Sequence, residues 1–132
     1  MPLVQISMRS GQSEAYRQAL FDSLYRAMRE SYDVPEDDQF MTIREHEAAN
    51  FRYSPTCLGI ARSDYALFIQ LTVSNTRTLE QKKALFRQIA QRLGESPGVR
   101  PEDVFINLVE VDKANWSFGH GLAQYVEAAR VL

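Results

Sequence analysis

Hydrophobic residues recur along this chain at helical spacing in two places. The first stripe follows Ser13, a suitable helix N-cap, and consists of Tyr16, Ala19, Leu20, Leu24, Ala27 and Met28. The second follows Thr78-Leu79-Glu80-Gln81, which has the form of a capping box, and consists of Leu85, Phe86, Ile89, Ala90 and Leu93. Gly94 and Pro97-Gly98 are expected to end the helix that carries this second stripe. The pattern predicts two amphipathic helices.

Four segments with strand patterns flank these helices. Residues 2–8 alternate loosely, and residues 66–73 are almost continuously apolar, as expected of a strand covered on both faces. Residues 40–45 and 104–111 complete the set. Residues 46–65 and 113–121 are predicted to be irregular connections, and residues 122–132 a short tail for which a helix is one interpretation.

Two short sequences recur at nearly the same spacing. Val34-Pro35-Glu36-Asp37 returns as Arg100-Pro101-Glu102-Asp103, an offset of 101 − 35 = 66, and Ala19-Leu20-Phe21 returns as Ala84-Leu85-Phe86, an offset of 84 − 19 = 65. We interpret this as a duplicated β-α-β unit, with a pseudo-repeat of residues 1–65 and 66–132 inside one domain, 1–132. Right-handed crossovers predict an α+β fold with both helices on one face of a four-stranded sheet. The other face, expected to be rich in Leu, Ile, Val and Phe, would be uncovered, which favours association through the sheet.

Composition excludes several classes of protein. The 132 residues carry a formal charge of −2, without the basic surplus of a nucleic-acid-binding protein. The start of the chain lacks the pattern of a signal peptide, no apolar run is long enough for a membrane helix, and the single cysteine fits a reducing compartment. We therefore expect a cytoplasmic protein that binds neither nucleic acid nor membrane. Most of its cations are arginines, which suit bidentate capture of carboxylates.

The candidate for chemistry is Pro2. If Met1 is removed, Pro2 carries a secondary amine that can accept a proton, donate one, or add to a carbonyl, and its rigid ring fixes the direction of the nitrogen. The acidic run Glu36-Asp37-Asp38 could suggest a metal, but no histidine cluster at ligand spacing supports one, and we expect none.

A duplicated β-α-β chain with Pro2 at its start resembles the tautomerase superfamily, which includes the 4-oxalocrotonate tautomerases. The likeness is strongest to the malonate semialdehyde decarboxylase group. The residues that carry it are Met1-Pro2-Leu3, Val34-Pro35-Glu36-Asp37-Asp38, Leu58-Gly59-Ile60, Arg77-Thr78 with Glu80-Gln81-Lys82, and Trp116-Ser117-Phe118-Gly119.

The resemblance implies a homotrimer that needs no cofactor, with Pro2 at the base of a small pocket. It implies that Pro2, Asp38 and Arg77 are catalytic, and that Arg77 binds the carboxylate of a small substrate. It places Trp116, Phe118 and Tyr125 in an aromatic wall. Asn75 stands near the place where the decarboxylases have a second arginine, and with Trp116, Phe118 and Tyr125 it is expected to bind substrate. The missing arginine weakens the expectation of decarboxylation. A cation at the Arg77 position opposes the dipole of the following helix, so a structural reason for it is not evident.

The charge of Pro2 divides the possible reactions. Burial beside aromatic side chains and the charge of Arg77 favour a neutral amine, a general base for keto-enol tautomerisation of 2-oxo acids. Asp38 favours the cation, an acid suited to a malonate semialdehyde decarboxylase or hydratase. Tautomerase is the leading hypothesis, the lyase is the alternative, and a non-catalytic trimeric binding protein is the third.

Overall fold

The computed structural model describes residues 2–131. Its strands are β1 (Leu3–Arg9), β2 (Met41–His46), β3 (Leu67–Ser74) and β4 (Val104–Val111), and its α-helices are α1 (Glu14–Ser31), α2 (Leu79–Glu95) and α3 (Gln124–Val131). Four short 3₁₀ turns lie in the connections: η1 (Ala48–Asn50), η2 (Cys57–Gly59), η3 (Pro101–Asp103) and η4 (Lys113–Asn115). The predicted order of elements is confirmed, and each strand lies within one residue of its expected bounds.

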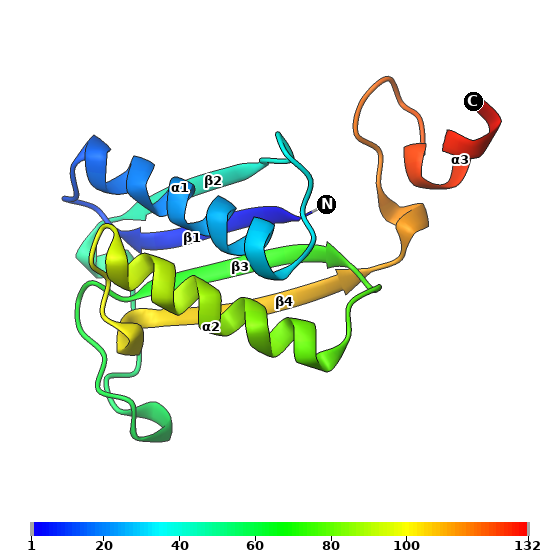
Figure 1. The fold of residues 1–132 in the computed structure, drawn as a ribbon. Coiled ribbons are helices and arrows are strands. Elements are labelled where there is room, and N and C mark those ends of the chain that lie inside the picture. The colour runs from blue at the N-terminus through cyan, green and yellow to red at the C-terminus, as the bar shows by residue number, and fades with distance from the viewer. Residues whose placement is uncertain (1, 132) are drawn as a thin grey trace.

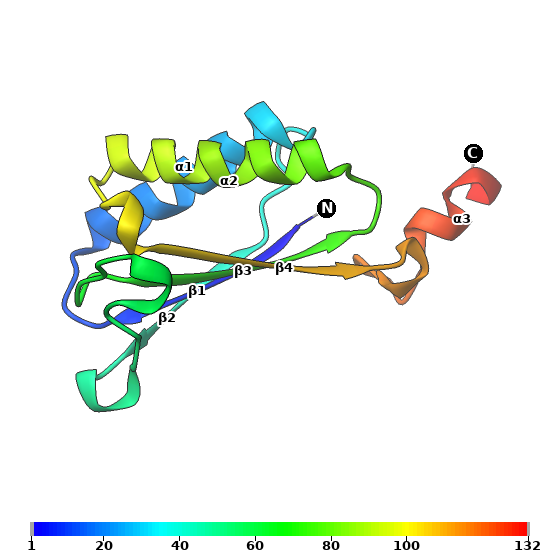
Figure 2. The same cartoon turned by 90° about the horizontal axis from the view of Figure 1, so that it is seen from below.

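The four strands form one mixed sheet in the order β2-β1-β3-β4 (Figure 1). β1 pairs in parallel with β2, β3 pairs in parallel with β4, and the two units meet through antiparallel β1 and β3. Figure 2 shows α1 and α2 side by side on one face of this sheet. The expected α+β architecture is therefore confirmed.

The structure gives the duplication one constant offset. Val4 pairs with Met41 and Ile69 pairs with Ile106, so the partner strand lies the same distance along the chain in both halves (41 − 4 = 106 − 69 = 37). The helix caps Ser13 and Thr78 lie 65 residues apart (78 − 13 = 65), and this offset matches residue 4 with residue 69. By this offset Asp103 corresponds to Asp38. The two Pro-Glu-Asp sequences, which match at an offset of 66, are therefore shifted by one position relative to the structural equivalence.

Both helix starts form as predicted. The Tyr16 N–H donates to Ser13 Oγ (3.0 Å) at the start of α1. At α2 the capping box is complete, since the Gln81 N–H donates to Thr78 Oγ1 (3.2 Å) and the Thr78 N–H donates to Gln81 Oε1 (3.0 Å). These bonds satisfy amide groups that a helix N-terminus otherwise leaves without partners.

The core lies between the two helices and one face of the sheet. Side chains of α1 and α2 meet alternate residues of β1 and β3, all of them buried: Leu20, Leu24, Met28, Leu85, Ile89, Leu93, Val4, Ile6, Ile69 and Leu71. Phe86, expected in this layer, is instead 37% exposed because it projects from the outer side of α2.

Two expectations about the sheet are wrong. Burial alternates along β3, with Gln70 exposed, so this strand is covered on one face only. The face away from the helices is also mixed rather than apolar. Its centre holds Gln5, Gln70 and Asn107, and Gln70 Nε2 donates to Asn107 Oδ1 (3.2 Å), while Leu3, Phe105 and Val109 add apolar area. Among the helices in the described residues, none is long and apolar enough to cross a membrane.

Candidate active site

Pro2 lies at the start of β1, where the strand is fixed to the chain that leads into β2. Pro2 is buried, and two residues later the Val4 N–H donates to the carbonyl of Phe40 (2.9 Å). Pro2 lines a cavity of about 230 Å³ together with Leu3, Phe40, Trp116, Ser117 and Phe118. The structure thus brings Pro2, Trp116 and Phe118 together from opposite ends of the chain, as predicted.

The aromatic wall is a chain of three rings. Trp116 stacks on Phe118 with ring centres 5.5 Å apart, and Phe118 meets Tyr125 edge to face at 4.9 Å. Trp116 is fixed to the sheet because its indole N–H donates to Oγ of Ser74 (3.1 Å), a buried residue at the end of β3. The three predicted aromatic residues therefore form one cluster beside Pro2.

Gln124 holds the segment that carries these rings. Its Oε1 accepts from the Phe118 N–H (2.9 Å), and its Nε2 donates to the Gly119 carbonyl (2.8 Å). Both bonds close the loop between Phe118 and α3, which projects beyond the end of the sheet (Figure 1). The wall of the cavity therefore lies on an arm, the chain from η4 to α3, which is held in shape by hydrogen bonds within the arm.

Asp38 is 6% exposed and faces positive charge. Burial raises the pKa of the Asp38 carboxyl, and the positive charges of the amino terminus and Arg77 act in the opposite direction. Burial also raises the pKa of the Tyr125 hydroxyl, with Asp38 raising it further and Arg77 lowering it. The charge of Arg77 therefore acts on both the Asp38 carboxyl and the Tyr125 hydroxyl, which places these three side chains near one another.

The structure shows contacts that explain why an arginine stands at position 77, which its place before a helix did not. One guanidinium nitrogen, Nη2, donates to the carbonyl of Tyr32 (2.7 Å), and the guanidinium carbon lies 4.8 Å from the centre of the Tyr32 ring. Nη1 donates to Thr76 Oγ1 (2.9 Å). Because Tyr32 ends α1, these contacts join the end of one helix to the start of the other and orient the guanidinium.

Asn75 does not line the cavity. It stands in the turn after β3, where its Nδ2 donates to Asp112 Oδ1 (2.7 Å) and its N–H donates to the Val111 carbonyl (3.0 Å). Its expected role in substrate binding stays a prediction. Four residues that the sequence did not assign to the site contribute to it, namely Leu3, Phe40, Ser74 and Ser117. The apolar pair reads as ordinary strand residues, and no local signal marks Ser74 as the partner of Trp116.

Of the three acidic residues 36–38, only Asp38 is buried, whereas Glu36 and Asp37 are exposed. In residues 2–131, no group of three or more His, Cys, Asp or Glu side chains is placed to hold a metal ion.

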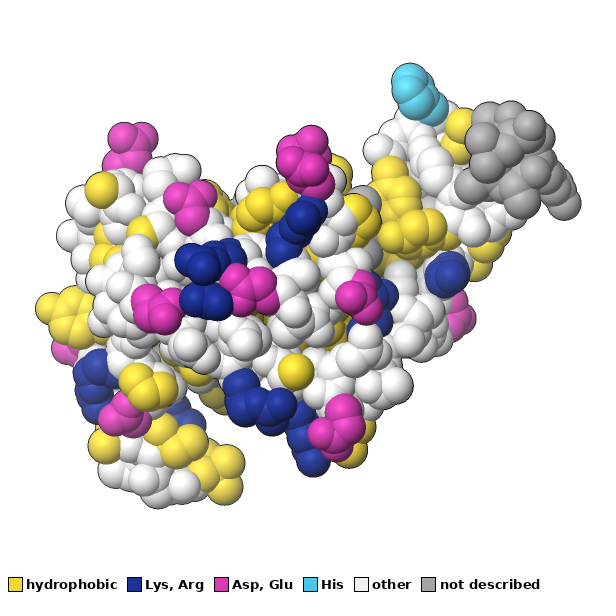
Figure 3. Space-filling model, viewed as in Figure 1, with side chains coloured by type: hydrophobic (Ala, Val, Ile, Leu, Met, Phe, Trp, Pro, Cys, Tyr) yellow, Lys and Arg dark blue, Asp and Glu magenta, His cyan; other side chains and the backbone are white. Residues whose placement is uncertain are grey.

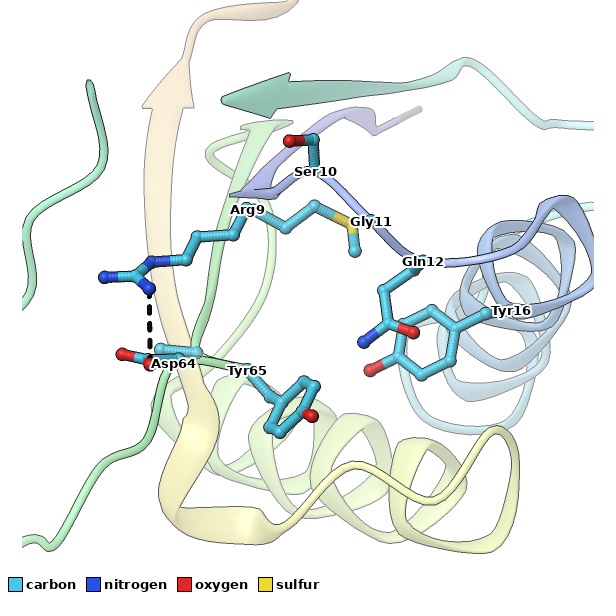
Figure 4. Close-up of a pocket in the computed structure, with 9 residues that line it drawn as sticks. Arg9, Ser10, Gly11, Gln12, Tyr16, Asp64 and Tyr65 are labelled. Carbon is cyan, nitrogen blue, oxygen red and sulfur yellow. Dashed lines mark ion pairs between the residues drawn. The ribbon is translucent and has the colours of Figure 1, made fainter. Parts of the chain in front are cut away.

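A larger cavity of about 300 Å³ lies at the other end of β1, between Arg9, Gln12, Tyr16 and Tyr65 (Figure 4). Arg9 pairs with Asp64 (3.2 Å), and its guanidinium points away from Gln12 and Tyr16. Burial, and to a smaller extent Asp103, raise the pKa of the Tyr16 hydroxyl, which keeps it neutral. The lining contains none of the residues expected to be catalytic, so the Pro2 cavity is the candidate active site.

Known proteins show the family to which this chain belongs. Two family models, both described as tautomerase enzyme, match residues 2–59 and 38–119. The "Probable tautomerase YusQ" of Bacillus subtilis (strain 168) is 47% identical over 127 residues, covering 96% of this chain and 100% of the relative. The chain belongs to the tautomerase family. It is an enzyme of the tautomerase superfamily.

Solved structures show the same fold. The chain resembles a malonate semialdehyde decarboxylase at a TM-score of 0.90 and 29% identity, with 96% of this chain and 98% of that chain covered. A second such decarboxylase, solved as inhibited by 3-bromopropiolate, gives a TM-score of 0.90 at 32% identity and 96% coverage of both chains. A fused 4-OT solved as a symmetric trimer gives a TM-score of 0.78 at 22% identity, covering 94% and 98%, which supports the fold alone.

Proposed function

We propose that this protein is a cofactor-independent tautomerase that uses the amine of Pro2, after removal of Met1, to move a proton between carbon and oxygen of small 2-oxo acids and their enols. The observation that carries the proposal is the position of Pro2, buried at the start of β1 in a cavity walled by Trp116 and Phe118. A cavity of about 230 Å³ suits a small substrate.

We propose a role for each neighbour of Pro2 from its charge and contacts. Arg77 holds the substrate carboxylate, since an arginine fork binds both oxygens of such a group, and its contacts with Tyr32 orient it. The apolar walls and Arg77 disfavour the charged amine, so Pro2 acts as the base. A negative charge on Asp38 would favour the charged form of the Pro2 amine. Because burial raises the pKa of Asp38, this carboxyl is protonated at a higher pH than an ordinary aspartate and then no longer favours the charged amine. Tyr125 closes the outer end of the wall.

Replacement of Pro2 tests the proposal. Mass spectrometry of natively produced protein first establishes that Met1 is absent. Pro2→Ala should then lower kcat/KM for phenylenolpyruvate by about 10²–10⁴-fold, the value of a positioned proton transfer. The molecular mass of the assembly should not change. Equal rates for parent and variant, or a natural protein that retains Met1, would reject Pro2 as the base.

A decarboxylase or hydratase of a three-carbon oxo acid is the second candidate. It is favoured by the two malonate semialdehyde decarboxylases that share this fold at 29% and 32% identity, the first of which was also studied as a proline-to-alanine variant at its first position. Product analysis with malonate semialdehyde separates the two candidates. In addition, 3-bromopropiolate should label Pro2 if the site handles the same class of acid as the inhibited enzyme.

We also propose that the protein assembles as a homotrimer, in keeping with the trimeric form of the fused 4-OT. The helix-bearing face carries acidic and basic side chains in alternation, as a solvent-facing surface does (Figure 3). The opposite face of the sheet presents Leu3 and Val109 among amides and is therefore proposed as the contact surface.

A further inference from the structure

The duplication gives the Pro2 cavity a counterpart elsewhere in the same chain. At the offset of 65 that separates the helix caps Ser13 and Thr78, Leu3 corresponds to Phe68, Phe40 to Phe105, and Phe118 to Tyr53. The turns η4 (Lys113–Asn115) and η1 (Ala48–Asn50) correspond in the same way. A second cavity of about 230 Å³ lies at these positions, lined by Arg52, Tyr53, Ser54, Cys57, Arg62, Phe68 and Phe105. The volume equals that of the Pro2 cavity. We refer to it as the counterpart cavity.

The lining of the counterpart cavity lacks the groups that the proposed reaction needs. The residue equivalent to Pro2 is Leu67, whose nitrogen is an amide within the chain and not a base. Asp103, the equivalent of Asp38, is 1% exposed and accepts two hydrogen bonds from Ser63, one from the N–H (2.7 Å) and one from Oγ (2.6 Å). The connection before β3, which contains Ser63, therefore supplies the hydrogen-bond donors to Asp103.

The counterpart cavity has instead two arginines. Arg62 Nη1 donates to the carbonyls of Cys57 (3.0 Å) and Ser54 (3.2 Å), which fixes the guanidinium at the cavity. Its other nitrogens make no hydrogen bond to the described residues, and Arg52 has neither an ion pair nor a hydrogen bond to any of them. The lining contains no acidic residue, and the rings of Tyr53, Phe68 and Phe105 supply an apolar interior.

We propose that the counterpart cavity is a second, non-catalytic binding site for a small apolar carboxylate, whose ring or alkyl body lies among Tyr53, Phe68 and Phe105 and whose carboxylate is held by Arg52 and Arg62. A carboxylate between two guanidiniums gains charge-assisted hydrogen bonds, and the aromatic residues gain buried apolar area. The enzyme thus carries two sites for acids of one class, only one of which has an amine. The proposal does not depend on whether Pro2 is catalytic.

The only cysteine of the chain reports on this site directly. Cys57 lines the counterpart cavity, and its exposed thiol can be alkylated by neutral iodoacetamide. Benzoate, used as the probe, should slow alkylation of Cys57 about fivefold or more at saturation, measured by intact-protein mass spectrometry. Benzamide, which has the same ring without the charge, should protect at least about tenfold less well by concentration, because it cannot pair with the arginines.

Matched substitutions assign the effect to the cavity. Arg52→Gln should raise the benzoate concentration for half-protection about tenfold, the loss of one charge-assisted contact. Arg44→Gln, a change of an exposed arginine on β2 outside the cavity, should leave it unchanged, and so should Pro2→Ala. Each rate is compared with that of the same variant without benzoate. Absence of protection by benzoate, equal protection by benzamide, or an unaltered response in Arg52→Gln would each overturn the proposal.

Discussion

Two aspartates in equivalent positions of the two halves show how one residue type serves different ends. Asp103 accepts two hydrogen bonds from Ser63 and fixes the entry to β3. Asp38 lies near the amino terminus and Arg77, in surroundings whose burial raises its pKa. The same substitution should therefore have opposite consequences at the two positions.

For Asp38→Asn, we expect a change in how stability depends on pH. A folded-state pKa above the ordinary 3.8 means that the native protein binds the proton more tightly than the unfolded chain. The free energy of unfolding of the parent should then fall as the pH rises from about 4 through the folded-state pKa, and this fall should be absent in the variant. Urea unfolding of both proteins between about pH 3.5 and 7 measures it. A parallel dependence in the two would contradict the assignment.

Asp103→Asn provides the opposite case. It replaces a buried carboxylate that accepts both bonds from Ser63, so we expect it to lower the free energy of unfolding by about 1.5–3 kcal/mol, the value of hydrogen bonds to a charged group. Urea unfolding at neutral pH is the measurement. If Asp103→Asn is no less stable than the parent, the Ser63 contacts do not hold the entry to β3.

At the level of elements, the arm from η4 to α3 depends on Gln124. Gln124→Ala removes the bonds to the Phe118 N–H and the Gly119 carbonyl, so the aromatic wall should lose its fixed position while the core is untouched. We expect KM for phenylenolpyruvate to rise about tenfold with less change in kcat, since the wall binds substrate and transition state alike. The melting temperature should stay within a few degrees, and a lower kcat at unchanged KM would contradict this role.

The elements themselves were predictable because their signals are local. Caps at Ser13 and Thr78, the apolar stripes and the turn residues all act within a few positions, and the structure reproduces them. The prediction for Phe86 was wrong because the spacing of a stripe does not show how far around a helix the buried face extends. Leu3, Phe40 and Ser74 reach the cavity through strand pairing and the return of the arm, which no local pattern encodes.

At the level of the whole molecule, the repeated sequence predicted the architecture but misjudged the free face of the sheet. Alternation along β3 puts Gln70 on that face, and a row of amides across the centre replaces the apolar surface that composition suggested. Amides can bond across an interface as well as to water, so a polar centre does not argue against association. It does mean that the contact depends on its apolar members, Leu3 and Val109.

Val109 allows the proposed trimer to be tested against a matched control. Its side chain is 38% exposed on the free face of β4, whereas Phe86 is 37% exposed on the outer side of α2. A carboxylate buried in a subunit interface without a partner costs several kcal/mol, so Val109→Asp should dissociate the assembly into folded monomers. Phe86→Asp should leave it intact, because that position stays in solvent. Sedimentation velocity gives the mass of each variant and circular dichroism its fold. Dissociation by Phe86→Asp and not by Val109→Asp would place the interface on the helices and reject assembly through the sheet.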